Sequence, residues 1–367
     1  MPLILTGTSG STTLDSSAGL TFSDSSNQAA AASPFGLKNR IINGDCRIDQ
    51  RNAGAVVTPA NGAYTLDRWG VNQFANASKF SVQQSSTVPT GFNNSLLVTS
   101  LSAYSVGVSD IYAIFQRIEG YNVADLGWGT ANAQTVTLSF WVRSSLTGTF
   151  GGAFQNDAGD RAYPFTYTIS SANTWEQKTI TVAGDTTGTW LKTNGSGLQI
   201  TFGLGVGSNR SATAGAWAAG NYGSATGATS VVGTNGATFY ITGVQFEIGS
   251  TATPFERRLY GQELANCQRY LPATYLSAHP GWCYATTGAI FAAPFAVPSR
   301  VYPSGLSVTP ASCIVYNGAL STAIPSAIAW NGATVYEGNF ATTTSAILTL
   351  GQSGGFTGNI LWTGCEL

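Results

Sequence analysis

ITGVQFEIGSTATPFERR, which spans Ile241–Arg258, is the stretch that decides the fold class of this chain. Its residues alternate between two faces over positions 240–248, and a side-chain period of two predicts a long, half-buried strand. One face would carry Tyr240, Thr242, Val244, Phe246 and Ile248, and the other Ile241, Gly243, Gln245 and Glu247. Gly249 and Ser250 end the pattern, and Pro254 lacks the N–H that a further ladder bond needs. The stretch therefore predicts a strand, then a turn, and then a charged segment that leaves the sheet.

A second stretch lies far upstream and reads RIINGDCRIDQRN, at Arg40–Asn52. It has the pattern of a first strand, punctuated by Asn43 and Gly44. The two stretches bracket about two hundred residues, a length that one all-β sandwich can fill. We therefore expect a single jelly-roll domain over residues 38–258.

Short apolar runs rich in β-branched and aromatic residues fill the space between these brackets, separated by Gly, Asn and Ser. Many short strands without long helical periods predict two packed antiparallel sheets. The expected strands are 68–74, 79–84, 96–99, 111–118, 135–144, 165–169, 177–182, 198–205 and 238–247. A helical turn at 122–128 would close one end of the sandwich.

Residues 259–271, LYGQELANCQRYL, form the one segment with clear helical spacing, and Pro272 ends it. The apolar stripe of this connector consists of Leu259, Leu264, Cys267 and Leu271. A single helix of this length is marginal in water. We therefore expect the stripe to pack against copies of the chain or against a neighbouring domain, and its four residues are candidates for an oligomer interface.

Residues 272–367 return to strand-like patterns and predict a second, smaller β-sandwich. The expected strands are 282–291, 307–309, 313–316, 334–339, 345–350 and 359–366. The chain is thus expected to be all-β, with the short helix joining a jelly roll to the smaller sandwich. The single histidine, His279, would lie in a loop beside Pro280.

Residues 1–37 are of low complexity and consist largely of Ser, Thr, Gly and Ala. Such a segment cannot bury enough apolar surface to fold alone. A short strand within 20–28 and a helical turn over 29–32 are the regular elements that we expect. The segment would become ordered by winding with copies of itself or by docking into another protein.

Charged residues are scarce: the 367 residues include 16 Lys and Arg and 17 Asp and Glu, or 9%, where soluble domains usually have ~25%. The net charge of −1 argues against nucleic-acid binding and against a basic membrane-surface protein, because both need a concentrated cationic patch. Residues 271–367 contain only Arg300, Glu337 and Glu366. This low charge favours a subunit of a larger particle.

The cysteines are widely spaced and lack a CxxC pair, which predicts buried free thiols in a reducing cytoplasm and neither a disulfide framework nor a zinc site. They are Cys46, Cys267, Cys283, Cys313 and Cys365. The opening MPLILTGTSG lacks the basic region and the long apolar run of a signal peptide. The apolar run at 288–297 is interrupted by Pro294 and is too short to span a bilayer. We expect no membrane insertion and no cofactor.

Four passages together resemble bacteriophage and prophage tail-fibre proteins. They are IINGDCRIDQRN (Ile41–Asn52), YTLDRWGV (Tyr64–Val71), ITGVQFEIGSTATPFERR and LANCQRYL (Leu264–Leu271). Members of that group pair an NGD-RIDQRN opening with a TLDRW strand and a closing TGVQLE-G--ATPFE-R. Cys46 replaces a larger apolar residue of that pattern and Phe246 replaces Leu, and both changes keep an apolar side chain. Residues 135–207 also look like the jelly-roll modules of carbohydrate-binding proteins.

The resemblance implies a homotrimeric virion protein that is assembled in the host cytoplasm. By the same resemblance, residues 1–37 would attach to other tail or baseplate proteins. The jelly roll would serve as a spacer or a glycan module, and residues 272–367 would form the tip. The implied partner is a host-surface glycan or receptor, and no catalytic residue is implied.

Few residues are candidates for metal or acid–base chemistry. Asp157 and Asp160, in QNDAGDRAY, are the best carboxylate pair for a hard cation or a glycosidase, although the same residues are typical of a turn. Asp45 and Glu247 would come together if the two bracketing strands pair. Jelly-roll carbohydrate modules often hold a structural calcium near their terminal strands, so the resemblance makes these two residues weak calcium candidates.

The nine tryptophans divide into core and surface candidates. Trp69 and Trp141 alternate with apolar neighbours in expected strands, which favours the core. An exposed indole face can stack on a sugar ring while its N–H donates a hydrogen bond. The candidates for such glycan contacts, at turns or strand ends or in the terminal domain, are Trp128, Trp175, Trp190, Trp217 and Trp282.

Three functions remain open at this point. The resemblance favours a tail-fibre subunit that mediates adsorption to the host. A tail-associated polysaccharide depolymerase would need a carboxylate pair in a cleft. A passive structural virion protein, such as a baseplate part or a capsid decoration, would need neither a cleft nor exposed aromatic residues.

Overall fold

The computed structural model describes residues 20–21, 27–28, 38–308, 314–317, 321–345 and 348–367. The chain divides into two compact units, Met1–Lys38 and Asn39–Leu367. In the first unit, strand β1 (Leu20–Thr21) pairs in antiparallel fashion with β2 (Asn27–Gln28), so the short strand expected there is a two-stranded ribbon. The helical turn expected at 29–32 lies outside the described residues.

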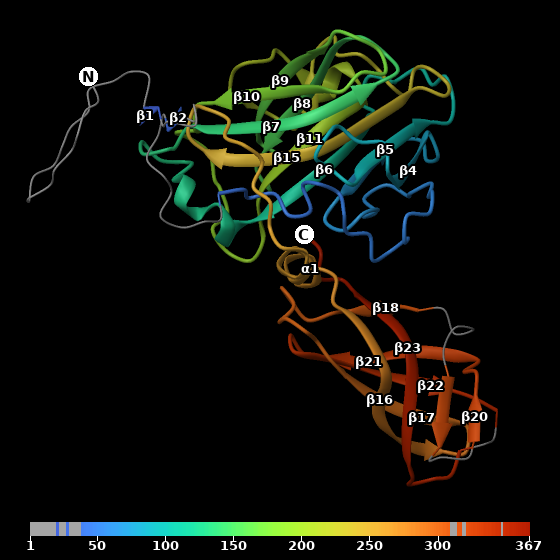
Figure 1. The fold of residues 1–367 in the computed structure, drawn as a ribbon. Coiled ribbons are helices and arrows are strands. Elements are labelled where there is room, and N and C mark those ends of the chain that lie inside the picture. Colours follow the sequence, from blue (N-terminus) through green and yellow to red (C-terminus); the bar gives the residue numbers. More distant parts are fainter. Residues whose placement is uncertain (1–19, 22–26, 29–37, 309–313, 318–320, 346–347) are drawn as a thin grey trace, which may run out of the picture. The chain divides into compact units, whose positions relative to one another are not determined.

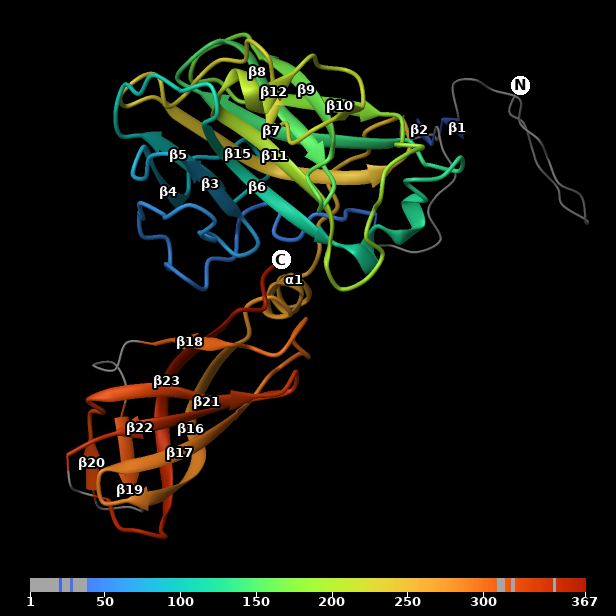
Figure 2. The same cartoon turned by 180° about the vertical axis from the view of Figure 1, so that it is seen from behind.

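Two antiparallel sheets form the jelly roll, as expected, and Figures 1 and 2 show them from opposite sides. The five-stranded sheet has the order β10 (Glu176–Val182), β7 (Val136–Ser144), β15 (Thr238–Ile248), β5 (Ser95–Ser100) and β4 (Phe80–Ser85). The six-stranded sheet has the order β13 (Ala218–Ala219), β9 (Arg161–Ile169), β8 (Gly148–Gln155), β11 (Ser196–Val206), β6 (Ile111–Glu119) and β3 (Gly70–Phe74). Short elements are η1 (Gly120–Asn122), η2 (Ala124–Leu126), η3 (Ser208–Arg210) and the parallel pair β12 (Ser211–Ala212) and β14 (Ser224–Ala225).

Aromatic rings from both sheets fill the core between them. Phe140 of β7 contacts Phe202 of β11 with ring centroids 5.1 Å apart, and Phe154 of β8 contacts Phe246 of β15 at 5.7 Å. Every strand expected between residues 68 and 247 is present, with ends shifted by a few residues. Strand β8 was not expected, because the three glycines and one alanine in GTFGGAFQ weaken its strand pattern.

Strand β15 occupies the centre of the five-stranded sheet, but its two faces are not those that strict alternation predicts. Gly243 has φ of +60°, and the register to β7 shifts between Thr242 and Gln245. This β-bulge shifts the alternation by one residue. Odd-numbered residues such as Ile241 face the core before the bulge, and even-numbered residues such as Val244 face the core after it. A Cβ on Gly243 would lie 2.6 Å from the Phe92 ring, which explains the glycine.

The segment 40–52 is not the strand that its pattern indicates. Asn43 and Cys46 have φ of 57° and 56°, which extended strands do not adopt. The Asn43 side chain closes the turn by donating to the Ile48 carbonyl at 2.8 Å and accepting from the Ile48 N–H at 3.0 Å. The segment nevertheless runs beside β15, since the Arg40 N–H donates to the Phe246 carbonyl at 2.9 Å.

The only α-helix in the described part of the chain is α1 (Tyr260–Gln268), at the position expected from sequence. After it, eight strands form one antiparallel sheet. These are β16 (Ala273–Ala285), β17 (Gly288–Pro294), β18 (Gly305–Ser307), β19 (Ile314–Asn317), β20 (Ser321–Ala323), β21 (Ala327–Ala333), β22 (Glu337–Thr343) and β23 (Ser353–Thr363). Their order is β20-β19-β23-β16-β17-β22-β21, and β18 pairs with β23.

This C-terminal sheet curls upon itself. Strands β22 and β23 are separated by two other strands in the sheet order, yet Phe340 of β22 contacts Phe356 of β23 with ring centroids 4.7 Å apart. The expected smaller sandwich is thus made from one curled sheet around its own aromatic core. Three details of the prediction were wrong: 282–291 is a hairpin, 345–350 contains no strand among its described residues, and His279 lies within β16.

Candidate functional site

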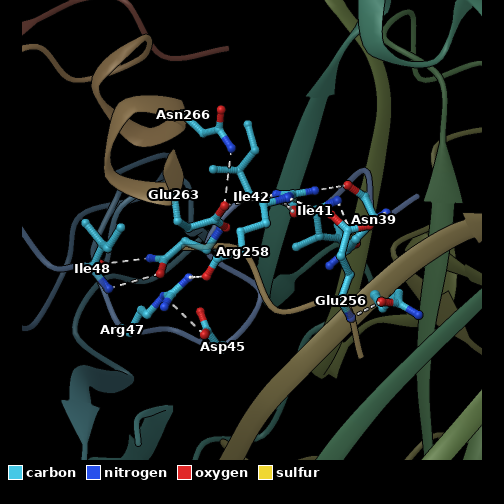
Figure 3. Close-up of polar contacts among 12 residues, drawn as sticks. Asn39, Ile41, Ile42, Asp45, Arg47, Ile48, Glu256, Arg258, Glu263 and Asn266 are labelled. Atoms are coloured by element: carbon cyan, nitrogen blue, oxygen red, sulfur yellow. Dashed lines mark hydrogen bonds and ion pairs between the residues drawn. The ribbon is translucent and has the colours of Figure 1, made fainter. Parts of the chain in front are cut away.

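The passages that resemble tail-fibre proteins lie around one buried junction, and Figure 3 shows its contacts among the opening segment, the segment that follows β15 and helix α1. Arg258 donates through Nη1 to the Ile41 carbonyl and to Glu263 Oε2, both at 3.0 Å. Glu263 of α1 also accepts the Asn43 N–H. One arginine and one glutamate thereby join the opening segment, the exit from β15 and the helix.

The TLDRW passage joins the same junction. Trp69 Nε1 donates to the Asn43 carbonyl at 3.0 Å, and Asn43 Nδ2 donates to the Asp67 carbonyl at 2.9 Å. The Asp67 carboxylate accepts the Gln50 N–H at 2.9 Å. Burial raises the pKa of Asp67 to about 6, and the bonds from Gln50 oppose this rise. These motif residues hold the architecture together, and their polar groups bond to one another.

Helix α1 packs within the chain, which is one of the two arrangements expected for it. Cys267 and Leu271 are fully buried, so they are not available to another copy of the chain. Leu264 is half-buried and Leu259 is 80% exposed. The candidate oligomer interface is therefore reduced to Leu259 and Leu264.

The last residues of the chain contact the jelly roll through arginines. The Glu366 carboxylate pairs with Arg51 at 2.7 Å and with the buried Arg68. The Leu367 backbone oxygen accepts from Tyr64 Oη at 2.6 Å and from Arg117 Nη1 at 2.7 Å. Arg300 also contacts the jelly roll, by donating from Nη1 to the Asn194 carbonyl at 2.7 Å, so two of the three charged residues of the C-terminal segment help to hold it there.

Three of the candidate tryptophans form one packed cluster. Trp128, Trp190 and Trp217 lie edge to face, with ring centroids 4.8–5.4 Å apart. Their indole N–H groups donate to backbone carbonyls at 2.8–3.2 Å. Trp128 is 3% exposed and Trp190 is 8% exposed, so neither offers a face to a sugar ring, and their selection as glycan contacts was wrong.

The remaining tryptophans are distributed differently. Trp175 is half-buried beside Tyr240, with ring centroids 6.1 Å apart. Trp282 of β16 is 56% exposed. Trp69 is in the core as expected, whereas Trp141 is only half-buried because its neighbours Phe140 and Val142 take the inward positions of β7.

The structure does not bring the candidate carboxylates together as a metal site. Asp45 pairs with Arg47 at 3.2 Å, and Glu247 accepts from Gln245 and from the Thr253 N–H. Asp160 accepts from Asn156 at 2.6 Å, while Asp157 is exposed. Within the described ranges, no group of three or more His, Cys, Asp or Glu side chains is placed to hold a metal ion.

A polar hollow of about 170 Å³ lies on the outer face of the six-stranded sheet. Its wall includes Asn72, Arg117, Gln155, Ser196, Gln199 and Asn221, and also Asp157. Arg117 of β6, Gln199 of β11 and Gln155 of β8 lie opposite one another in the strand register. These three side chains face outward because their neighbours Ile118, Leu198 and Phe154 face the core.

The segment that follows β11 forms the other side of this hollow. It crosses the outer face of the sheet so closely that a Cβ on Gly151 would lie 2.4 Å from Ser224 Oγ. Glycine at this position of β8 permits the crossing. The same segment contributes Asn221 to the wall, and Asn221 accepts from Gln155 Nε2 at 2.8 Å. Apart from Asp157, sequence reasoning missed this site because strand pairing, not spacing along the chain, assembles it.

No helix in the described part of the chain is long and apolar enough to cross a membrane. No family model matches the chain, and no curated protein matches it. Solved structures do match the chain, and each of the three described next covers only part of it.

The enzymatically active domain of tailspike protein 4 from bacteriophage CBA120 is 14% identical, with a TM-score of 0.30. That match covers 52% of this chain and 21% of the tailspike domain, so it spans about a fifth of that domain's length. A putative sugar-binding protein from Bacteroides thetaiotaomicron is 10% identical over 58% of this chain and 100% of its own, with a TM-score of 0.36. A family 11 carbohydrate-binding module from Clostridium thermocellum is 14% identical over 53% of this chain and 96% of its own, with a TM-score of 0.28.

Proposed function

We propose that this chain is a non-enzymatic subunit of a phage tail fibre that recognises a glycan on the host surface. The tail-fibre assignment rests on the four passages that resemble this class of protein. The junction supports it, because the first three passages contact one another there, Asn43 and Arg258 bond to Glu263 of α1, and Gln50 donates to the Leu271 carbonyl of the fourth passage. A pattern that is spread over more than two hundred positions of the chain thus corresponds to one structural unit.

The proposed assembly is a homotrimer located in the tail fibre of the virion and assembled in the host cytoplasm. Residues 1–37 attach it to other tail or baseplate proteins. Closed symmetry of this kind covers the exposed Leu259 and the half-buried Leu264 together with free sheet edges.

The exposed aromatic face of the C-terminal sheet carries the proposal of host recognition. Trp282 and Tyr284 lie two positions apart on β16 and are 56% and 47% exposed, while Cys283 between them is buried. Residues two apart on a strand share a face, so both rings lie on the exposed face of β16. Aromatic rings bind the apolar faces of sugars, and the absence of charge on β16 and β17 favours a neutral partner.

The absence of enzymatic activity is part of the proposal. Glycoside hydrolysis commonly needs two carboxyl groups on either side of the scissile bond. The wall of the polar hollow includes Asp157 and no second Asp or Glu. A depolymerase would release fragments from host surface polysaccharide during incubation with the purified chain, and we expect none.

Two measurements test the proposal. Gold-labelled antibody against this chain should decorate the tail fibres of intact virions, and labelling of the capsid or baseplate would contradict the assignment. Purified full-length chain should block phage adsorption, and Trp282→Ala should block it at least tenfold less well. The matched control is Tyr121→Ala, since Tyr121 is 61% exposed but lies in the jelly roll. Equal blocking by both variants would place recognition elsewhere.

A further inference from the structure

We propose that the polar hollow on the outer face of the six-stranded sheet is a second ligand site, which binds one unit of a neutral, polyhydroxylated ligand such as a hexose. This site is formed by β6, β8, β11 and the segment around Asn221, whereas the aromatic face lies on β16. It therefore goes beyond the function proposed above.

The hydrogen bonds in the wall have a fixed direction. Arg117 can only donate, and its Nε donates to Gln199 Oε1 at 2.8 Å. Gln199 must then present its amide nitrogen, which donates to Gln155 Oε1 at 3.0 Å. Gln155 Nε2 donates in turn to Asn221 Oδ1 at 2.8 Å. The Asn221 amide nitrogen at the end of this row keeps its two N–H groups for a ligand.

Ser196 is the observation that points to a ligand rather than to a solvated surface. Its side chain is 5% exposed, it lines the hollow, and its Oγ has no hydrogen-bond partner among the described residues. A buried hydroxyl without a partner destabilises a protein, and a bound molecule can supply the missing hydrogen bond. Nine buried side-chain atoms of the described residues lack a partner, and Ser196 is the one of these residues that lines the hollow. The Asn72 amide and the Asp157 carboxylate also line the hollow.

The chemistry of the wall selects the class of ligand. Amide and hydroxyl groups both donate and accept, which matches the hydroxyl groups of a sugar. Asp157 disfavours an anion, and the single guanidinium of Arg117 is already bonded to Gln199 and to the Leu367 backbone. No aromatic ring lines the hollow for a nucleobase to stack on. Its volume of about 170 Å³ is below the ~300–1,000 Å³ of pockets for drug-sized ligands, which limits it to one ring.

The test is titration of the purified full-length chain with methyl glycosides of glucose, galactose, mannose and N-acetylglucosamine, followed by saturation-transfer NMR and calorimetry. At least one neutral glycoside should bind saturably, with a Kd on the order of 1 mM, and methyl glucuronide should bind more weakly. Ser196→Ala should weaken binding about tenfold without lowering the melting temperature, because it removes an unpaired hydroxyl.

Two variants provide controls. Thr168→Ala changes an exposed outer-face residue of β9 in the same sheet, away from the hollow, and should bind as the parent does. Tyr121→Ala changes a 61% exposed residue of the jelly roll that does not line the hollow, and it should also bind as the parent does. Failure of every neutral glycoside to bind, unchanged binding by Ser196→Ala, or loss of binding in either control would overturn the inference. The assay uses no virus, so its outcome is independent of where the chain lies in the virion.

Discussion

Replacing Glu366 by glutamine removes the carboxylate that pairs with the buried guanidinium of Arg68. The Arg68 side chain is 1% exposed, and Glu366 pairs with it and with Arg51. Breaking a buried ion pair by removing one partner costs about 3–5 kcal/mol, because the remaining charge stays buried without compensation. Glu366→Gln is therefore expected to lower the free energy of unfolding by much more than a surface substitution does.

The surroundings of Arg68 set the magnitude within that range. Arg68 keeps a hydrogen bond to the Arg117 carbonyl and lies 3.6 Å from the centroid of the Tyr270 ring. A glutamine at 366 also keeps one acceptor oxygen. These remaining contacts favour the lower end of the range, and we expect a loss of about 3 kcal/mol.

Urea unfolding at pH 7, followed by tryptophan fluorescence, measures this loss. The matched control is Glu337→Gln, because Glu337 is exposed and makes no ion pair within the described part of the chain. The control should stay within about 0.5 kcal/mol of the parent. If Glu366→Gln is equally close to the parent, the link between the chain's last residues and the jelly roll contributes no stability and our reasoning is refuted.

Three further predictions concern assembly and pH. Light scattering should give three times the subunit mass, and a monomer mass at micromolar concentration would refute the trimer. Leu264→Asp should weaken that assembly by placing a charge in the interface, whereas Gln262→Asp, at an exposed position of the same helix, should not. Burial raises the pKa of Asp67 from 3.8 to about 6. The folded state therefore holds the proton of this carboxyl group more tightly than the unfolded state does. The resulting contribution to the free energy of unfolding is present below about pH 4 and is lost as the pH rises from about 4 to 6. In the parent this loss amounts to up to about 3 kcal/mol of unfolding free energy, and Asp67→Asn should abolish it. Identical pH profiles of unfolding free energy for the parent and the variant would contradict this.

Local pattern was sufficient to predict most of the secondary structure. Strands such as β6 and β7 were found at the expected positions because alternation of apolar and polar side chains is a property of consecutive residues. The helix at α1 followed from its spacing and from Pro272 for the same reason. Where glycine replaced that pattern, as in β8, the prediction failed.

The candidate site depended on tertiary structure. Burial of Trp128 and Trp190 follows from packing against Trp217 and the core, which residue type does not reveal. The bulge at Gly243 reverses which side chains of β15 face the core. Glycine is needed there because Phe92, about 150 positions away, leaves no room for a side chain. The hollow exists because antiparallel pairing places Arg117, Gln199 and Gln155 side by side.

The sequence by itself thus determined an all-β chain with one short helix and a C-terminal domain with few charged residues, since these follow from composition and from neighbouring residues. The tertiary structure alone decided which aromatic rings are exposed, which carboxylates have partners and where polar groups meet without satisfying one another. Those properties depend on which strands pair and in which register, and pairing is a relation between residues that are far apart along the chain.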